Sequence, residues 1–392
     1  MTQNPESDTP ARRMRVVVTG ASGNVGTPLV RRLLSDGHDV VGLCRRIPPA
    51  TPPYDGARWH RVDLSYARAE DLVEVFRGAD AVIHLAWGFQ PTRDVDHHRR
   101  LGVGGTAAVV TACRLAGVPH LVHQSSVGAY APVSDGGPGV SVDTRVSEGA
   151  ELGGVPTAAY NHHRTAAEHL LDQHEREHPG TPTIARMRAA FIVHGEAASG
   201  LVRYFSPAFA PARLIRALPV LPVDRRLTVP LVHGDDMASA LAAAATTGAQ
   251  GAFNIAAEPP VTRDMIAREL GAVPVGLPFG ILRRLVHVSW LLHLQPLSIG
   301  WVDLAFGVPL MHTTRARAEL GWHTPRSRPT RPCARSSTPS PPDGPGRPRP
   351  CARGPCGMRW PHCAAAAPST SGTSPDRRGP AVDDRPHRPA AS

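Results

Sequence analysis

The chain has 392 residues, enough for two domains or for one large domain with an appended lobe. Its formal net charge is +10, and all 43 of its basic residues are arginine. Twelve of these arginines lie in 326–392 with only four acidic residues, which leaves 31 arginines against 29 acidic residues, a balance of +2, in the rest of the chain. This near-neutral body gives no reason to expect nucleic-acid binding.

From Arg15 onward, short runs rich in β-branched residues alternate with helical patterns. The expected strands are residues 15–19, 38–43, 58–62, 80–85, 120–124 and 183–187. The expected helices between them are residues 27–34, 69–77, 99–116 and 158–178. This alternation predicts an α/β fold with a parallel, doubly wound sheet of the Rossmann type. Such sheets bind ligands beyond the C-terminal ends of their strands.

The regular pattern weakens after residue 195, where proline interrupts the apolar stretches. The helices expected there are residues 235–246, 262–270, 279–293 and 313–320. We therefore expect a smaller substrate-binding lobe beside the sheet. The predicted organisation is a disordered leader, a dinucleotide-binding Rossmann domain, a mixed substrate-binding lobe and a disordered tail, over residues 1–13, 14–195, 196–325 and 326–392.

The tail, 326–392, contains 15 of the 41 prolines and no Leu, Ile, Phe or Tyr. Such a segment buries too little apolar surface to offset its ordering entropy, so we expect disorder. One interpretation is that its arginines bind an anionic partner. We prefer another, a frameshift near 325–330 in a GC-rich gene. An alternative reading frame that encodes no leucine-containing helix there would defeat this hypothesis.

The cysteines and the N-terminus favour a cytoplasmic protein. Cys44 and Cys113 are isolated in the body and make no disulfide framework, and the four tail cysteines lack the paired short spacing of zinc ligands. We therefore expect no metal site. The first 14 residues lack the basic start and apolar run of a secretory signal. The most apolar stretch, 275–310, is interrupted by Arg283, Arg284 and His287, which argues against a membrane span.

A glycine-rich turn joins the first expected strand to the first expected helix. Glycines allow a tight turn and let the backbone approach a pyrophosphate closely, and the free N–H groups of the following helix then face the phosphates. This context predicts a bound dinucleotide rather than a simple connecting turn. The expected cofactor-binding residues of the turn are Gly20, Ser22, Gly23, Asn24, Val25 and Gly26.

The end of the second expected strand bears on the choice of dinucleotide. An acidic residue about 20 positions beyond the glycines usually binds the ribose 2′-hydroxyl of NAD. Here the strand ends in Cys44, Arg45 and Arg46, with no carboxylate. Arginine suits a 2′-phosphate through charge-assisted hydrogen bonds. We therefore favour NADP(H) over NAD(H). The alternative is that both arginines are solvated surface charges.

Several longer motifs accompany the turn. They are TGASGNVG at 19–26, VDLS at 62–65, HLAW at 84–87, SSVGAY at 125–130, YNHHR at 160–164, VHGDDMA at 232–238, FNIA at 253–256 and ARAELGW at 316–322. In combination, over about 15–325, they resemble the extended short-chain dehydrogenase/reductase family, the NAD-dependent epimerase/dehydratases.

The resemblance implies roles for particular residues. The adenine of the cofactor would be flanked by Asp63 and Leu64. The middle of the cofactor would be bordered by Leu85, Ala86 and Trp87. The family's catalytic Ser/Thr and catalytic Tyr match Ser126 and Tyr160. A tyrosine hydroxyl can give or take a proton at a substrate oxygen, and a serine can hydrogen-bond the same oxygen.

Three positions depart from the family pattern. The family has a lysine four residues after its tyrosine, which favours the phenolate and hydrogen-bonds the nicotinamide ribose, whereas this lysine-free chain has Arg164. Arginine keeps the charge but is planar and bulkier, so the exchange is not conservative. Gly102 replaces a frequent asparagine, and the dipeptide 189–190 is Ala-Ala where Pro-Gly is common.

The leading hypothesis is an NAD(P)-dependent oxidoreductase, epimerase or dehydratase that acts on a small hydroxyl- or carbonyl-bearing molecule, such as a sugar nucleotide, by reversible hydride transfer. In it Ser126 orients the substrate, Tyr160 is the acid/base and Arg164 stands in for lysine. The second hypothesis is a non-catalytic dinucleotide-binding sensor or scaffold, and the third is an anionic-partner binder acting through the tail. A homodimer is the oligomeric state we consider.

Overall fold

The computed structural model describes residues 12–88, 91, 93–132, 145–193 and 219–325. The expected tail, and all but the last two residues of the expected leader, lie outside the described residues.

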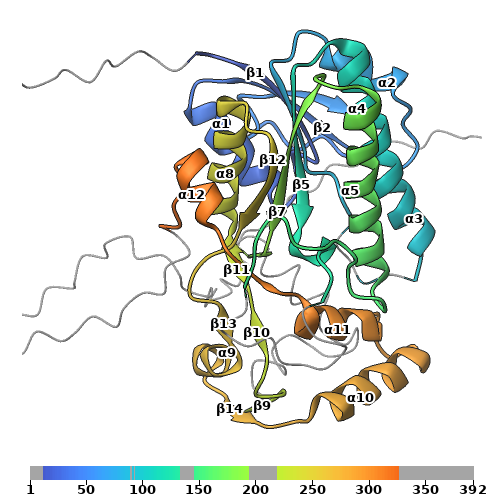
Figure 1. The fold of residues 1–392 in the computed structure, drawn as a ribbon, viewed down its shortest axis with the longest axis vertical. Coiled ribbons are helices and arrows are strands. Elements are labelled where there is room, and N and C mark those ends of the chain that lie inside the picture. Colours follow the sequence, from blue (N-terminus) through green and yellow to red (C-terminus); the bar gives the residue numbers. More distant parts are fainter. Residues whose placement is uncertain (1–11, 89–90, 92, 133–144, 194–218, 326–392) are drawn as a thin grey trace, which may run out of the picture. The chain divides into compact units, whose positions relative to one another are not determined.

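A seven-stranded parallel sheet forms the centre of the fold (Figure 1). Its strands in spatial order are β12 (Gly251–Ile255), β7 (Thr183–Ala189), β5 (His120–Ser126), β4 (Ala81–His84), β1 (Arg15–Thr19), β2 (Asp39–Cys44) and β3 (Arg58–Arg61). This sheet confirms the predicted doubly wound, Rossmann-type architecture. The strand order reverses beside β1, and β1 has β2 on one side and β4 on the other. That reversal is where such folds bind ligands.

Helices cover both faces of the sheet (Figure 1). Val16 and Val18 of β1 belong to the cluster of buried residues that also contains the apolar side chains of α1 (Gly26–Ser35) and α8 (Gly234–Thr247). Val17 points to the opposite cluster, with α2 (Glu70–Phe76), α4 (Gly105–Ala116) and α5 (Ala159–Glu177). Burial on both faces explains why β1 is a continuous valine run rather than an alternating one.

The helix expected over 99–116 is divided into three parts. They are α3 (Val95–Arg99), a π-helical turn η1 (Arg100–Gly104) and α4 (Gly105–Ala116). Glycine is a weak helix former, and three glycines lie at positions 102, 104 and 105. Single π turns inside α-helices frequently occur at functional sites.

The sheet does not end at the boundary predicted at residue 195. Its outer strand β12 and the covering helix α8 both come from the segment that was assigned to the lobe. A β11–β8 pair, Leu231–His233 with Phe191–Val193, leads into α8. His233 then caps α8, because its Nδ1 accepts the backbone N–H of Asp235 at 3.2 Å.

The lobe consists of short elements. Its helices are α9 (Arg263–Leu270), α10 (Phe279–Leu291) and α11 (Ile299–Gly307). The last described helix, α12 (Thr314–Leu320), returns to the sheet instead, where its buried Ala316 and Leu320 join the core cluster that contains α8 (Figure 1). Its strands are β9 (Val220–Pro222), β10 (Thr228–Val229), β13 (Val261–Thr262), β14 (Val273–Val275) and β15 (Leu310–Met311), and β15 pairs with β6 (Arg145–Val146). We did not expect α11. Its sequence, IGWVDLAFG, is apolar on nearly every side and shows no helical period.

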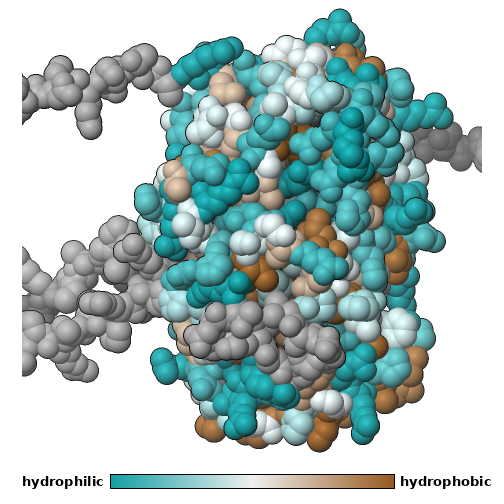
Figure 2. Space-filling view, in the orientation of Figure 1, coloured by the Kyte–Doolittle hydropathy of each residue, from teal (hydrophilic) through white to brown (hydrophobic). Residues whose placement is uncertain are grey.

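The apolar stretch 275–310 is divided between α10 and α11. On α10 a stripe of apolar side chains remains exposed, formed by Ile281, Leu285, Val288 and Leu291. Figure 2 shows hydrophobic residues at the edge of the molecule where Figure 1 places this helix. Among the described residues, no helix combines the length and the apolar character needed to cross a bilayer.

Candidate active site

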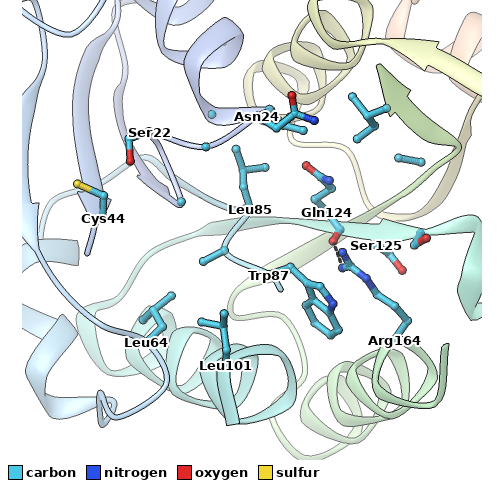
Figure 3. A pocket seen from close by; sticks show the side chains of 18 of the residues that line it. Ser22, Asn24, Cys44, Leu64, Leu85, Trp87, Leu101, Gln124, Ser125 and Arg164 are labelled. Atoms are coloured by element: carbon cyan, nitrogen blue, oxygen red, sulfur yellow. Dashed lines mark hydrogen bonds between the residues drawn. The ribbon is translucent and has the colours of Figure 1, made fainter. Parts of the chain in front are cut away.

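A cavity of about 480 Å³ lies at the C-terminal ends of the central strands (Figure 3). This volume is within the usual range for small-molecule and cofactor sites. Of the residues predicted for the site, all except Asp63 line it: Gly20, Ser22, Gly23, Asn24, Val25, Gly26, Arg45, Arg46, Leu64, Leu85, Ala86, Trp87, Ser126, Tyr160 and Arg164. The fold therefore brings together segments that are far apart in the sequence.

The glycine-rich turn packs too closely against its surroundings to hold larger side chains. A Cβ atom on Gly26 would lie 2.3 Å from the Gly20 carbonyl oxygen. Gly20 has φ +69°, and a Cβ there would lie 2.9 Å from the backbone nitrogen of Ala86. No side chain caps the N-terminus of α1. The Thr27 N–H already donates to the Gly23 carbonyl at 3.0 Å and Pro28 has no N–H, so Gly26 is the residue of this first turn whose amide can face an anion in the cavity.

Asp63 does not line the cavity. Its carboxylate accepts hydrogen bonds from the backbone N–H of Ser65 at 3.0 Å and from the Ser65 hydroxyl at 2.5 Å. Burial acts to raise the pKa of Asp63, but these hydrogen bonds outweigh it and hold the pKa below its usual range. The carboxylate thus stabilises a local turn, and Leu64 alone of the pair lines the cavity.

The end of the cavity beside β2 carries positive charge. β2 ends at Cys44, and the two arginines that follow, Arg45 and Arg46, are exposed and line the cavity. No carboxylate occurs among the described residues that line it.

A directional chain of hydrogen bonds fixes the turn after β4. Thr19 Oγ1 accepts the backbone N–H groups of residues 85 and 86, at 3.2 and 3.3 Å, and lies 2.7 Å from His84 Nδ1. We infer that its own hydrogen is donated to Nδ1. On the other side of the ring, the Thr106 hydroxyl donates to the Gly102 carbonyl at 2.7 Å and lies 3.1 Å from His84 Nε2. Nε2 therefore carries the ring proton, and His84 is neutral.

Burial lowers the pKa of His84 from 6.5 to about 3, and the charge of Arg164 adds to this effect. The next histidine on the sheet, His123, is also fully buried, and its pKa is lowered well below 6.5 for the same reason, with further contributions from His84 and Arg164. The two buried rings are thus uncharged, and their centroids are 5.3 Å apart. The charge of Arg164 acts on both of them.

The two hydroxyl groups of the expected catalytic set lie on different elements. Ser126 ends β5 and caps the short 3-10 helix η2 (Val127–Ala129), where its Oγ accepts the Gly128 N–H at 3.1 Å. Its hydroxyl hydrogen has no acceptor among the described residues. Tyr160 stands in the first turn of α5, with its ring 5.7 Å from that of Trp301 on α11. A Cβ on Gly300 would lie 2.3 Å from the Thr157 carbonyl oxygen, so glycine permits α11 to approach this closely.

Arg164 lies one helical turn beyond Tyr160 on α5 and is 3% exposed. Its Nε donates to the Tyr160 hydroxyl at 3.1 Å. Its Nη1 donates to the Gln124 carbonyl at 2.7 Å (Figure 3). Burial lowers the pKa of Arg164 below its usual value, and the adjacent Tyr160 opposes that shift. An arginine nevertheless stays charged at neutral pH, so a buried cation touches the tyrosine oxygen.

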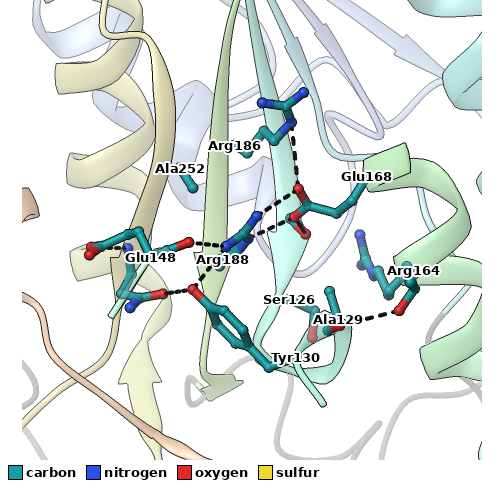
Figure 4. Close-up of polar contacts among 12 residues, drawn as sticks. Ser126, Ala129, Tyr130, Glu148, Arg164, Glu168, Arg186, Arg188 and Ala252 are labelled. Carbon is teal, nitrogen blue, oxygen red and sulfur yellow. Dashed lines mark hydrogen bonds and ion pairs between the residues drawn. The ribbon is translucent and has the colours of Figure 1, made fainter. Parts of the chain in front are cut away.

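A buried ion-pair network supports the same helix (Figure 4). Glu168, one turn beyond Arg164, accepts two hydrogen bonds from Arg188 of β7, at 2.9 and 3.0 Å, and one from Ser125 at 2.5 Å. Arg186 Nε lies 3.5 Å from the same carboxylate. Burial acts to raise the pKa of Glu168, but Arg188 outweighs it and the pKa is lowered. The network ties α5 to the two strands whose ends line the cavity.

Some lining residues escaped the sequence analysis. Those on the ends of β5 and β7 follow from the rule that ligands bind at the C-terminal strand ends, whereas Leu304 belongs to the unexpected α11. The lining residues we did not predict are Leu43, Cys44, Val62, Leu101, Gln124, Ser125, Val127, Ala189, Ala190, Phe191, Ile192 and Leu304.

Comparison with known proteins places this geometry among characterised folds. The model of the NAD dependent epimerase/dehydratase family matches residues 16–256. An uncharacterised protein of Mycobacterium tuberculosis is 30% identical over 316 residues, which are 79% of this chain but only 28% of that protein's length. A UDP-glucose 4-epimerase of Mycolicibacterium smegmatis is 36% identical over 126 residues, 30% of this chain and 40% of the relative.

A solved structure shares the fold. It is the enzyme WbmG of Bordetella bronchiseptica in complex with NAD, which aligns with a TM-score of 0.58 at 19% identity and covers 82% of this chain and 91% of that one.

Proposed function

The chain belongs to the NAD-dependent epimerase/dehydratase family, and from this premise we propose that it binds a nicotinamide dinucleotide in the cavity and uses it to oxidise and reduce a small hydroxyl- or carbonyl-bearing substrate. The observation that carries the proposal is the contact between the buried Arg164 and the Tyr160 hydroxyl, at 3.1 Å. It places a permanent cation on the atom that has to exchange a proton with the substrate oxygen.

The residues around the cavity fit the cofactor. The glycines at 20 and 26 let the turn fold tightly against its own backbone and that of Ala86, and both line the cavity, so a pyrophosphate can lie against the turn with the Gly26 N–H as a donor. At the other end, the buried Gln124 Oε1 has no hydrogen-bond partner within the described part of the chain, so it can accept a donor of a bound ligand. The nicotinamide, when bound, supplies the hydride chemistry.

We also propose that the phosphorylated cofactor, NADP(H), is preferred. The support is that Arg45 and Arg46 line the cavity after β2, where no carboxylate is present among the described lining residues to bind a ribose 2′-hydroxyl. The carboxylate of Asp63, which follows β3, lies outside the cavity lining, and its Oδ1 accepts both hydrogen bonds from Ser65.

In the proposed reaction each side chain has one task. The Tyr160 hydroxyl gives a proton to the substrate oxygen during reduction and takes it back during oxidation. The hydroxyl of Ser126, whose oxygen is held by the Gly128 N–H, donates to the same oxygen. Arg164 stabilises the tyrosine when its proton has left, and its Nη2, which donates to no described residue, is the donor left for the cofactor's ribose.

The substrate class is proposed from the family. Sugar nucleotides are the substrate type named for the mycobacterial epimerase relative. Phe191, Ile192 and Leu304 also line the cavity, and they supply apolar surface against which a sugar or another ring can pack.

A non-catalytic dinucleotide-binding protein is the second candidate, and the observation that favours it is the replacement of the family's lysine by Arg164. Turnover separates the two. NADPH consumption is followed with a panel of ketones and aldehydes, and NADP⁺ reduction with alcohols and UDP-glucose. We expect Tyr160→Phe to lower turnover by about 10²–10⁴-fold while the Kd for NADPH changes by less than about twofold.

The matched control is Tyr66→Phe, because Tyr66 is 73% exposed and lies outside the cavity lining. Unchanged turnover in Tyr160→Phe would remove this tyrosine from the mechanism. Tight NADPH binding with no turnover on any member of the panel would favour the non-catalytic candidate.

A further inference from the structure

Gly102, in the π turn η1, leaves the space that the Trp87 indole occupies. A Cβ on Gly102 would lie 2.8 to 3.1 Å from three atoms at the benzene edge of that ring. Two of the three contacts are shorter than 3.0 Å, which real Cβ atoms essentially never show, so any other residue at this position would force the indole to move. The neighbouring Gly104 differs, because a Cβ there would meet nothing within 4 Å.

The face of the same ring holds the Arg164 guanidinium. The Arg164 Cζ lies 3.7 Å from the centroid of the Trp87 ring. Among the described residues no carboxylate forms an ion pair with this buried arginine; its direct polar partners are the Tyr160 hydroxyl and the Gln124 carbonyl. A buried charge needs compensation, and an indole face stabilises a desolvated cation. A guanidinium also stacks flat on an aromatic ring in a way that a compact ammonium does not.

The backbone on both sides of this contact is held in place. Trp87 follows the turn that the Thr19 hydroxyl binds, and the Gly102 carbonyl accepts the Thr106 hydroxyl at 2.7 Å. His84 links the two hydroxyl groups. Because the backbone on both sides is held in this way, a side chain at position 102 would have to displace the Trp87 indole itself, and with it the ring face that contacts Arg164.

We propose that Gly102, Trp87 and Arg164 are one interdependent positioning unit, in which the glycine admits the indole and the indole holds the guanidinium against Tyr160. Two positions where the chain departs from its family, the glycine and the arginine, thereby have a single explanation. The unit rests on the proposed function, because it serves the proton transfer at Tyr160 and the binding of the cofactor ribose.

Two double-mutant cycles test the unit, with the Kd for NADH and the melting temperature of the full chain as readouts. In the first, Trp87→Leu weakens NADH binding about tenfold in the natural background but less than about twofold in the Arg164→Lys background, where no guanidinium needs the ring. Trp87→Phe, which keeps an aromatic face, stays within about threefold of the natural protein.

In the second cycle, Gly102→Ala lowers the melting temperature by about 4 °C and weakens NADH binding about tenfold. In the Trp87→Leu background the same substitution leaves both unchanged or raises the melting temperature, because alanine is the better helix former. The matched control is Gly104→Ala in the natural background. It should leave NADH binding unchanged and should leave the melting temperature unchanged or raise it.

The proposal is overturned if Trp87→Leu weakens NADH binding equally in both backgrounds, since the ring would then be only a cofactor contact. It is also overturned if Gly102→Ala is equally harmful with and without the indole. A folded natural protein that binds neither NADPH nor NADH would defeat the proposed function instead. In that case the melting temperatures of the single and double variants would still show whether the three residues are coupled.

Discussion

The neutral, fully hydrogen-bonded His84 makes the fold sensitive to acid. In the native state Nδ1 accepts the Thr19 hydroxyl, so a second ring proton has no place without breaking that bond. Burial lowers the pKa of His84 to about 3 from 6.5. The unfolded chain therefore binds more protons than the folded chain between these two values, and stability is complete above pH 6.5 and falls as the pH drops toward 3.

The size of the effect follows from the same two values. At pH 5 the pH is about 1.5 units below the pKa of the unfolded histidine, whereas the folded histidine is still neutral. One pKa unit corresponds to about 1.36 kcal/mol, so at pH 5 His84 lowers the free energy of unfolding by about 2 kcal/mol. A glutamine at this position can accept from Thr19 and donate to Thr106 but does not titrate. His84→Gln should therefore lose about 2 kcal/mol less than the natural protein between pH 7.5 and pH 5.

Urea unfolding followed by circular dichroism at both pH values measures this difference. Contributions from other histidines, including His123, are common to both proteins and cancel. The control is His169→Gln, because the His169 side chain is 62% exposed and should leave the acid loss unchanged. Equal acid losses in the natural protein and His84→Gln, to within about 0.5 kcal/mol, would refute the assigned hydrogen-bond chain.

Two further predictions concern the surrounding charges. Glu168→Gln should destabilise the fold by about 3–5 kcal/mol in urea unfolding, because it leaves Arg188 buried without its carboxylate. Glu175→Gln, which removes a partly exposed partner of Arg186, should cost less than about 1 kcal/mol, and equal losses would contradict the importance of burial. Replacing both Arg45 and Arg46 by alanine should raise the Kd for NADPH about tenfold or more while that for NADH changes by less than about twofold, and a parallel change in both would reject the NADP(H) preference.

Local patterns in the sequence were enough to predict the sheet and the glycine-rich turn. The valine run of β1 and the glycines that follow it depend on neighbours only a few residues away, so strand, turn and helix could be assigned from spacing. The same reasoning could not find α11, because a helix buried on nearly all sides carries no amphipathic period. Nor could it place β12 in the sheet, since a short strand far along the chain shows no sign of its partner.

Side-chain direction limited the prediction of the site. Asp63 lies at the expected sequence position, but its carboxylate is turned to Ser65 by a hydrogen bond two residues away. The contact between Trp87 and Arg164 requires three segments to meet, and only the fold shows that Gly102 makes room for it. Taken one at a time in the sequence, Arg164 and Gly102 are only two departures from the family pattern.

Titration of the full chain with NADPH and NADH, followed by nicotinamide fluorescence, tests the central claim most directly. The account predicts saturable binding by the natural protein and its loss in Gly26→Ala, whose added Cβ would lie 2.3 Å from the Gly20 carbonyl oxygen. Gly149→Ala, where a Cβ meets nothing within 4 Å, should bind as the natural protein does. A folded natural protein that binds neither dinucleotide, or a Gly26→Ala variant that binds both unchanged, would contradict the claim that the turn at 20–26 holds the cofactor.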